Sequence, residues 1–426
     1  MKINGKREYE LLDKIGFIRM AGSLEEAKAG QILLDEIKGM GLTADYEAFD
    51  IYDADITKAE LEILEPFNQK YTVTAYKFSE NTPDSGLIAP FYYAEGLTAA
   101  DMAQAKGKIV LVNGYLNLEM FRKLLQCGAA AFITMSGTMI ENEENSDLFT
   151  RSLRDTLRTF GNMPGANIRV TDAFDMVSKG AAKAKLTVLN TTKTLPSHNI
   201  IVTLPGTERP EEIVSFGAHY DSVEFSTGVY DNGAGSVINM EILRHFVENP
   251  PKRTLKFMWY GSEEIGLEGS KAYVRMHETE LKKHIYMINV DVAGSVIGGD
   301  VARVVALQAA SDHADYFMKT KGYAVEVKQD IYSSDSIPFA DKGIPAINFI
   351  RFGHQLGGTF IHCRGDVIDY LSAESLERTT KFILDYSQEV INSVVFPIQR
   401  TVPTEMVEKI DKYLFKKELE EAKKDK

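Results

Sequence analysis

The 426-residue sequence has only two cysteines, Cys127 and Cys363, which lie far apart and lack the spacing of a metal-binding motif. So few cysteines exclude a disulfide scaffold, and we expect reduced thiols in a reducing compartment. No stretch approaches the about 18 apolar residues that a membrane span needs. The first 15 residues also lack the apolar core of a signal peptide. A cytoplasmic location without a membrane partner is therefore expected.

Positively charged residues are outnumbered by negatively charged ones. The formal net charge is −13, because 61 acidic residues outnumber 48 lysines and arginines. This excess argues against nucleic acid or an anionic membrane as the main partner. Hydrophobic residues make up 44% and charged residues 26% of the chain, which is the balance of a globular protein with room for about two or three domains. No internal repeat is evident.

Residues 1–50 and residues 51–192 differ in the secondary structure that their sequence patterns predict. Residues 1–50 predict the N-terminal helix and strand of a core, and the helix follows Ser23, three residues before Glu26, as in a capping box. Residues 51–192 contain short β-like runs separated by turns, with one helix at "NLEMFRKLLQCGA". We interpret this segment as an inserted, mainly β domain, in which no constellation of acids and histidines occurs.

In residues 193–426, near-continuous apolar strands alternate with amphipathic helices. This alternation predicts an α/β fold with a mostly parallel central sheet that helices cover on both faces. The tail from about residue 403, which ends in "KKELEEAKKDK", is expected to be a charged, solvated helix or a frayed end.

Acids and a histidine follow three of these apolar strands. His219 and Asp221 come after "IVSFGA", Glu263 and Glu264 after "LKFMWYGS", and Asp291 after "YMIN". Ligands of open α/β sheets bind beyond the carboxyl ends of the strands, so these side chains are expected to converge. Two adjacent glutamates at the end of a buried strand are unusual, because neighbouring side chains of a strand point to opposite sides and like charges repel.

Further candidates lie in two loops. Asp231 stands in the glycine-rich turn "VYDNGAG", and His354 and His362 follow the strand "IPAINFIR". Converging carboxylates and imidazoles are the ligands that zinc takes. Five or six such groups are too many for one zinc, but they suit two metals about 3.5–4 Å apart that share a bridging carboxylate and a bridging water.

Each candidate also has a structural interpretation. The glutamate pair could end a strand in a solvated loop, Asp231 could form an Asx turn, and His362 and Asp366 could be ordinary polar loop residues. The remaining histidines sit in predicted helices or surface-like positions and are expected to be structural: His198, His245, His277, His284 and His313.

Five pieces occur in the order "GAHYDS", "VYDNGAGSV", "WYGSEEIGLEGS", "INVDVAG" and "IHCRGDVID". Together they resemble the zinc-dependent aminopeptidases of the MH clan (metallopeptidase family twenty-eight), a clan that also holds glutamate carboxypeptidases and glutaminyl cyclases. The segment "GFIRMAGSLEEAKAGQILLDEIKGMGL" resembles the opening helix of these enzymes. The inserted domain is similar to a protease-associated domain at "GKIVLVNGY", "KLLQCGAAAFITMSG" and "MPGANIRV". The resemblance therefore covers nearly the whole chain.

The resemblance implies two Zn²⁺ ions per chain. His219 and Asp291 would hold one zinc. Glu264 and His362 would hold the other, and Asp231 would bridge the two ions. The resemblance also implies a cis peptide bond after this bridging aspartate.

Two catalytic roles follow from the same resemblance. Glu263 would be the general base that activates the metal-bridging water, and Asp221 would orient His219. One departure concerns "YSSDSIPFADKG", where Ser336 stands in place of a histidine of many relatives. This difference affects the hydrogen bonds on the substrate side, where Tyr332 is a candidate oxyanion donor and His354 a candidate substrate contact.

The sequence thus predicts a two-zinc aminopeptidase that hydrolyses the first peptide bond of peptides with a free N-terminus. A carboxypeptidase or a dipeptidase on the same two-metal core is an alternative, whereas a glutaminyl cyclase is disfavoured because that chemistry uses one zinc. A non-catalytic, receptor-like binding protein is a further alternative, although all five ligand positions and the base are filled. The sequence leaves open the side-chain preference, the oligomeric state and the role of the inserted domain.

Overall fold

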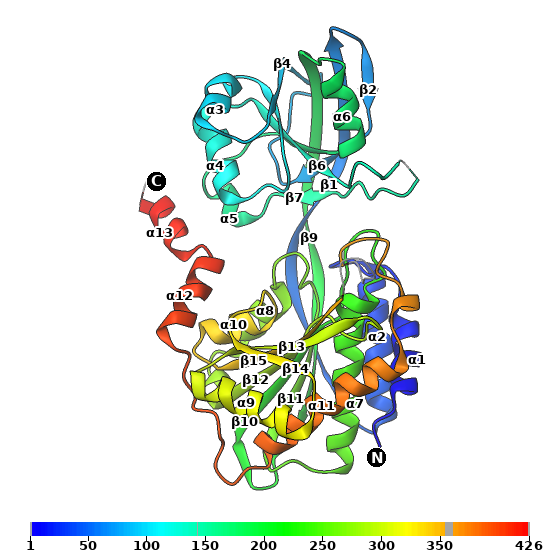
Figure 1. The fold of residues 1–426 in the computed structure, drawn as a ribbon, viewed down its shortest axis with the longest axis vertical. Coiled ribbons are helices and arrows are strands. Elements are labelled where there is room, and N and C mark those ends of the chain that lie inside the picture. Colours follow the sequence, from blue (N-terminus) through cyan, green and yellow to red (C-terminus); the bar gives the residue numbers. More distant parts are fainter. Residues whose placement is uncertain (1, 143, 354–360, 425–426) are drawn as a thin grey trace. The chain divides into compact units, whose positions relative to one another are not determined.

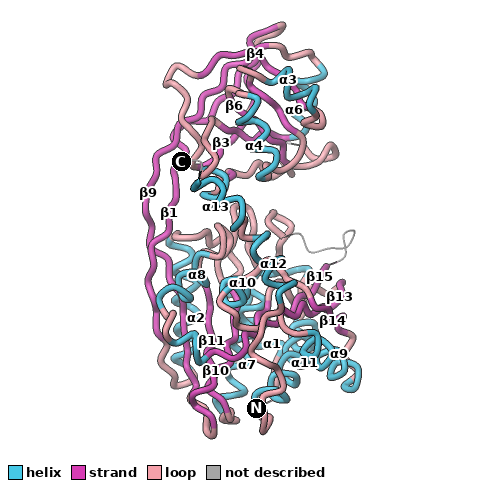
Figure 2. Tube along the Cα trace, turned by 90° about the vertical axis from the view of Figure 1, so that its left-hand side faces the viewer, coloured by secondary structure: helices cyan, strands magenta, loops and turns pink. Residues whose placement is uncertain are grey.

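The computed structural model describes residues 2–142, 144–353 and 361–424. The chain forms two compact units, which we call the core unit (Met1–Ile51 and Pro196–Lys416) and the inserted unit (Tyr52–Leu195 and Lys417–Lys426). Two long strands, β1 (Asp45–Glu65) and β9 (Lys183–Leu204), each contribute residues to both units. They pair with one another and lie side by side in Figures 1 and 2.

The core unit contains a mostly parallel sheet with the strand order β14–β13–β15–β12–β10–β11–β9. Among the described residues of this strand order, the pairs β13–β15 and β11–β9 are antiparallel and the other four pairs are parallel. The further strands are β10 (Arg209–His219), β11 (Arg253–Tyr260), β12 (His284–Val290), β13 (Gly298–Val305), β14 (Val325–Gln329) and β15 (Ala346–Gly353). The predicted α/β fold class with a mostly parallel central sheet is confirmed.

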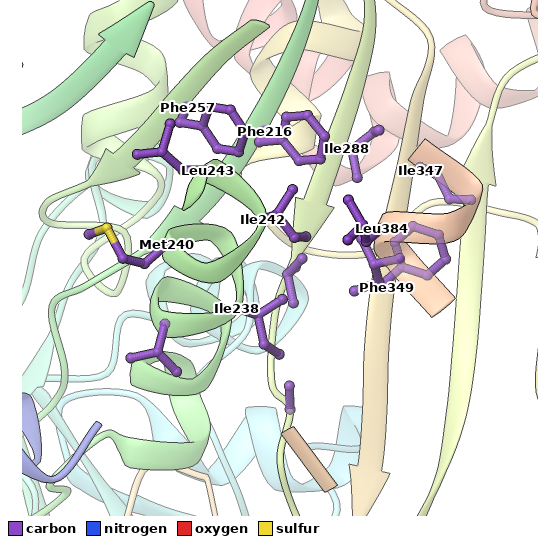
Figure 3. Close-up of a cluster of buried hydrophobic side chains, with 14 of the residues drawn as sticks. Phe216, Ile238, Met240, Ile242, Leu243, Phe257, Ile288, Ile347, Phe349 and Leu384 are labelled. Carbon is purple, nitrogen blue, oxygen red and sulfur yellow. The ribbon is translucent and has the colours of Figure 1, made fainter. Parts of the chain in front are cut away.

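Helices cover both faces of this sheet, which is why its strands are apolar along their length. One face packs against α1 (Gly5–Ile15), α2 (Leu24–Gly39), α7 (Ala234–Glu248), α9 (Gln308–Lys321) and α11 (Ala373–Ile391). The other packs against α8 (Glu268–Met276), α10 (Ser336–Asp341) and α12 (Thr404–Tyr413). Along β11, Phe257 and Trp259 enter the first core, whereas Met258 and Tyr260 enter the second. Figure 3 shows Phe216 and Phe257 beside α7 in the first core.

The helix predicted after Ser23 is α2, but the predicted capping box forms only in part, because the Ser23 amide donates to the Met20 carbonyl at 3.0 Å and not to Glu26. The Ser23 hydroxyl oxygen accepts a hydrogen bond from the Glu26 amide at 3.0 Å and caps α2.

The prediction that the C-terminal tail is a solvated helix or a frayed end is wrong for α12, because Met406 and Ile410 are fully buried in a cluster that also contains residues of α10 and α8. A short helix α13 (Lys416–Lys424) follows.

The inserted unit has its own sheet with the strand order β9–β4–β5–β6–β8–β3–β7, and β1 pairs with β2. Its strands are β2 (Gln69–Tyr71), β3 (Val73–Lys77), β4 (Leu87–Ala94), β5 (Ile109–Val112), β6 (Ala131–Ser136), β7 (Arg151–Ser152) and β8 (Gly165–Arg169). Its helices are α3 (Ala99–Ala105), α4 (Leu118–Cys127), α5 (Asp155–Arg158) and α6 (Val170–Ser178). The sequence predicted α4 alone, so the unit is more helical than expected. Among the described helices of the whole chain, none combines the length and apolar character needed to cross a membrane.

Candidate active site

Three neighbouring strands of the core sheet end at the same edge. His219 is the last residue of β10 and pairs with Tyr260, the last residue of β11. Gly217 of β10 pairs with Asn289 of β12, so Asp291 follows at the same level. The parallel register therefore brings together the side chains that the sequence places after separate strands.

A short irregular helix, η1 (Val229–Gly233), carries Asp231 to this edge. The Asp231–Asn232 peptide bond is cis, as the resemblance implies. One oxygen of Asp231, Oδ1, lies 3.1 Å from Nε2 of His219. The other, Oδ2, lies 3.1 Å from Nε2 of His362. A single carboxylate thus contacts both predicted histidine ligands.

Each histidine also contacts one further predicted ligand. Nε2 of His219 lies 3.5 Å from Oδ1 of Asp291, and Nε2 of His362 lies 2.9 Å from Oε2 of Glu264. The ligand atoms of His219, Asp231 and Asp291 lie within 4.8 Å of one another, and so do those of Asp231, Glu264 and His362. A third such group joins His219 to Glu263 and Glu264. The first two groups share Asp231, which is the arrangement that two metal ions with a bridging carboxylate require.

Burial and mutual charge shift the ionisation of these groups. Burial raises the pKa of Glu264 to about 7 and also raises the pKa of Asp291. Burial lowers the pKa of His362, but the Glu264 and Asp231 carboxylates outweigh it and raise that pKa to about 11. The same balance raises the pKa of His219 well above its ordinary value, through Glu263 and the neighbouring aspartates. Without a metal, the acids therefore hold the histidines protonated.

This donor set fits zinc. Among the described residues, the buried atoms Oε1 of Glu264 and Oδ1 of Asp291 have no hydrogen-bond partner. Unpaired buried carboxylate oxygens are costly unless a cation meets them. Imidazole nitrogen and carboxylate oxygen are both zinc ligands, and zinc would replace the imidazole protons.

Asp221 is buried behind the two glutamates. Its Oδ1 accepts a hydrogen bond from the Glu263 amide at 3.0 Å, and its Oδ2 accepts one from the Glu264 amide at 3.2 Å. Oδ1 also lies 3.4 Å from Nδ1 of His219. Asp221 therefore holds the backbone of the turn after β11 and lies beside the imidazole of His219.

Two residues that support Asp231 were not predicted. Asp366 accepts hydrogen bonds from the amides of Tyr230 at 2.8 Å and Asp231 at 3.2 Å, so it is more than an ordinary loop residue. Asn232 donates to the Val290 carbonyl at 2.8 Å and so ties the turn to the end of β12. Their only sequence signals were the short polar strings "HCRGD" and "DNGAG", which do not reveal these long-range partners.

Arg19 is another buried residue that the sequence did not single out. Its guanidinium donates to the carbonyls of Ile15 at 3.0 Å and Gly228 at 2.7 Å, and also to those of Phe17, Tyr220 and Thr227. Burial lowers its pKa to about 10, although Asp366 and Asp221 favour its charge. A buried cation therefore braces the loop that leads from β10 to Asp231.

On the substrate side, Tyr332 is half-buried and its ring lies 6.1 Å from that of Phe352. Burial and then the nearby Asp291 raise the pKa of Tyr332, which keeps its hydroxyl protonated. Ser336 is buried, and its hydroxyl lies 3.1 Å from that of Ser334. His354 lies outside the described residues.

The five histidines expected to be structural all have contacts elsewhere. His284 is fully buried rather than surface-like: its Nδ1 lies 2.6 Å from the Ser215 hydroxyl. The other contacts are a stack of His198 on Tyr46, a hydrogen bond between His245 and Gln388, an ion pair of His277 with Glu47, and the ring of His313 near Tyr386.

Comparisons with known proteins relate the chain to peptidases. The sequence profile of peptidase family M28 matches residues 199–387, the segment that contains every predicted metal ligand. Aminopeptidase YwaD of Bacillus subtilis is 28% identical, in an alignment that covers 91% of this chain and 84% of the relative. Carboxypeptidase Q of Bos taurus is 27% identical and covers 72% of this chain and 70% of the relative.

The solved structure of a zinc aminopeptidase from Bacillus subtilis, BSAP, is similar over both units. It superimposes with a TM-score of 0.75 at 25% identity, covering 95% of this chain and 100% of that chain. The similarity therefore extends beyond the segment that the family profile matches.

Proposed function

We propose that the chain is a zinc-dependent aminopeptidase of peptidase family M28 that hydrolyses the N-terminal peptide bond of peptides. The observation that carries this proposal is the position of Asp231, whose two oxygens each lie 3.1 Å from a different histidine. Such a shared carboxylate suits a two-metal hydrolase better than a site for one ion.

We propose two Zn²⁺ ions per chain. His219 and Asp291 would hold one ion, and Glu264 and His362 the other. Asp231 would be shared by both. When bound, zinc supplies Lewis-acid polarisation of the scissile carbonyl and stabilises the charge that develops on its oxygen.

Glu263 is the proposed general base. Its Oε2 lies 3.9 Å from Nε2 of His219, and burial raises its pKa well above the ordinary value of a glutamate. A raised pKa suits a carboxylate that takes a proton from the attacking water and passes it to the departing amine. Asp221 holds the backbone of this residue, and the Tyr332 hydroxyl is a proposed donor to the oxyanion.

The similarity to aminopeptidases favours a substrate with a free α-amine. Aminopeptidase YwaD and the zinc aminopeptidase BSAP are both similar to this chain over most of its length. We therefore propose peptides with a free N-terminus as the substrates.

Carboxypeptidase activity is the second candidate, since the chain is similar to carboxypeptidase Q over 70% of that relative. Aminoacyl-p-nitroanilides and N-acylated dipeptides separate the two activities when assayed before chelation, after chelation and after zinc is returned. We expect zinc-dependent hydrolysis of the unblocked substrates. Hydrolysis of the N-acylated dipeptides alone would contradict the aminopeptidase proposal.

The role of Glu263 can be tested in the same assay. Glu263→Gln should lower kcat by about 10²–10⁴-fold, the usual contribution of a general base, while zinc content is retained. Glu268→Gln is the matched control, because Glu268 lies five residues further along the chain on α8 and pairs with Lys271 at 3.4 Å. An active Glu263→Gln enzyme would exclude this role.

We also propose that the inserted unit is a protease-associated-like domain, on the strength of the motifs around β5, α4 and β8. The cytoplasmic location expected from the sequence stays a prediction.

A further inference from the structure

The turn that carries both catalytic-site glutamates is held by two buried carboxylates from distant parts of the chain. Three consecutive amide groups, those of Ser262, Glu263 and Glu264, point toward them. The Ser262 amide donates to Oε1 of Glu26 at 2.9 Å. The next two amides donate to Asp221 at 3.0 and 3.2 Å. Each of these three amides therefore has a carboxyl oxygen as its acceptor.

Ser262 adopts a left-handed backbone conformation with φ 58°, which residues other than glycine rarely adopt. Such a conformation persists only where surrounding contacts enforce it. Here the enforcing contacts come from Glu26, which also accepts a hydrogen bond from the Ser262 hydroxyl at 3.1 Å. Glu26 therefore holds the residue immediately before Glu263 at two points.

Both carboxyl oxygens of Glu26 accept hydrogen bonds. It is 2% exposed and lies in the first turn of α2. Its Oε1 also accepts from the Ser197 hydroxyl at 3.1 Å, and its Oε2 accepts from the Gly22 amide at 2.8 Å. The Ser197 and Ser262 hydroxyls lie 2.8 Å apart and close the network. The start of a helix favours an anion, so this carboxylate is well placed as an acceptor.

We propose that Glu26 is a positioning residue for the general base. It acts through the backbone of Ser262, and the inference rests on the role proposed above for Glu263. Ser262 lies 236 residues away along the chain, and Glu26 falls outside residues 199–387, which the family profile matches. Helix α2 thus helps to position the general base, in addition to packing against one face of the sheet.

A purely structural role for Glu26 can be separated from this one. Ser23 caps α2 with its own hydroxyl, which accepts from the Glu26 amide at 3.0 Å and does not involve the Glu26 side chain. Ser23→Ala therefore weakens the helix and leaves the turn contacts in place. Glu26→Gln keeps the helix cap and the side-chain volume, but it replaces one acceptor oxygen with an NH₂ group, which then faces the amide donor of Gly22 or of Ser262.

Both variants are made in the full chain, loaded with zinc and assayed on an aminoacyl-p-nitroanilide. We expect Glu26→Gln to lower kcat by about tenfold or more, because small misplacements of a catalytic group cost up to about 10²-fold. We expect KM and zinc content to stay within about twofold of wild type, since a positioning defect acts on the reaction step. Ser23→Ala is expected to lower Tm and to leave kcat unchanged.

Three results would overturn the inference: wild-type kcat in Glu26→Gln, an equal kcat loss in Ser23→Ala, or a loss that appears in KM alone. If Glu26→Gln does not fold, Ser197→Ala removes one hydrogen bond to Glu26 and should lower kcat several-fold at wild-type zinc content. Wild-type kcat in that variant would also contradict the inference. An inactive wild-type enzyme would refute the proposed function itself, which is a distinct outcome.

Discussion

Removal of the metal should make the stability of the protein depend on pH in a defined direction. In the metal-free protein, burial raises the pKa of Glu264 from 4.5 to about 7. A shift of one pKa unit corresponds to about 1.4 kcal/mol, so this group alone accounts for about 3 kcal/mol. A carboxyl whose folded pKa is raised binds more protons folded than unfolded. Its stabilising effect is therefore complete below pH 4.5 and is lost as the pH rises through 7.

Other buried groups have the same sign. Asp335 is 1% exposed and interacts electrostatically with His219 and Asp291, and burial raises its pKa to about 7. The pKa of His362 is raised to about 11, so its contribution is complete below pH 6.5 and is lost as the pH rises toward 11. The lowered pKa of Asp231 acts only in strong acid and does not oppose this trend near neutrality. Chelated protein should therefore be more stable at pH 5.5 than at pH 8.

Thermal unfolding of chelated and zinc-loaded protein at these two pH values is the assay. Between pH 5.5 and pH 8 the shift of Glu264 accounts for about 2 kcal/mol of this loss, which corresponds to roughly 4–8 °C in Tm for a unit of this size. Zinc binds ionised carboxylates and neutral imidazoles, so the rise in Tm on adding zinc should be larger at pH 8. Glu264→Gln should flatten the pH dependence of the chelated protein. Chelated wild type with a higher Tm at pH 8 than at pH 5.5 would refute the reasoning.

Three further predictions concern single side chains. Burial raises the pKa of Glu8, which accepts a hydrogen bond from Thr380, so the ionisation of Glu8 opposes folding above pH 4.5. Glu8→Gln should therefore stabilise the protein by roughly 1–3 kcal/mol at pH 8 and by little at pH 4. A lower Tm of this variant than of wild type at pH 8 would contradict the prediction. In α12, Ile410→Ala should lower the free energy of unfolding by about 2–5 kcal/mol in a denaturant titration. Val407→Ala, at a position that is 39% exposed, should lower it by under about 0.5 kcal/mol. Equal effects of the two substitutions would show that α12 is not packed. Tyr332→Phe should lower kcat by about 10²-fold with little change in KM if the hydroxyl stabilises the oxyanion, and unchanged kcat would remove that role.

The parallel sheet and the converging acids could be predicted because both follow from local patterns. A parallel strand that helices cover on both faces has to be apolar along its length, as β11 is, so the next polar residues mark its carboxyl end. His219, Glu263 and Asp291 stand at such positions in three strands that prove to be neighbours. The resemblance to known peptidases then supplied the expected roles.

The supporting residues could not be predicted, because their partners are distant in sequence. Asp366 holds a backbone 135 residues away, and Glu26 holds one 236 residues away. Glu26 reads locally as part of a helix cap, and only the fold shows that its carboxylate faces another element. The α12 error has a related cause: charged residues dominate the tail, and only Met406 and Ile410, four residues apart, form its fully buried stripe.

The adjacent glutamates show how backbone conformation resolves an apparent conflict in the sequence. In a continuing strand, Glu263 and Glu264 would point to opposite faces of the sheet. The strand instead ends at Tyr260, and the left-handed Ser262 redirects the chain so that both carboxylates face the histidines. Glu263 then lies 3.9 Å from His219, and Glu264 lies 2.9 Å from His362. Each carboxyl group thus faces a different histidine, at the place where the proposed mechanism needs one acid as a base and the other as a ligand.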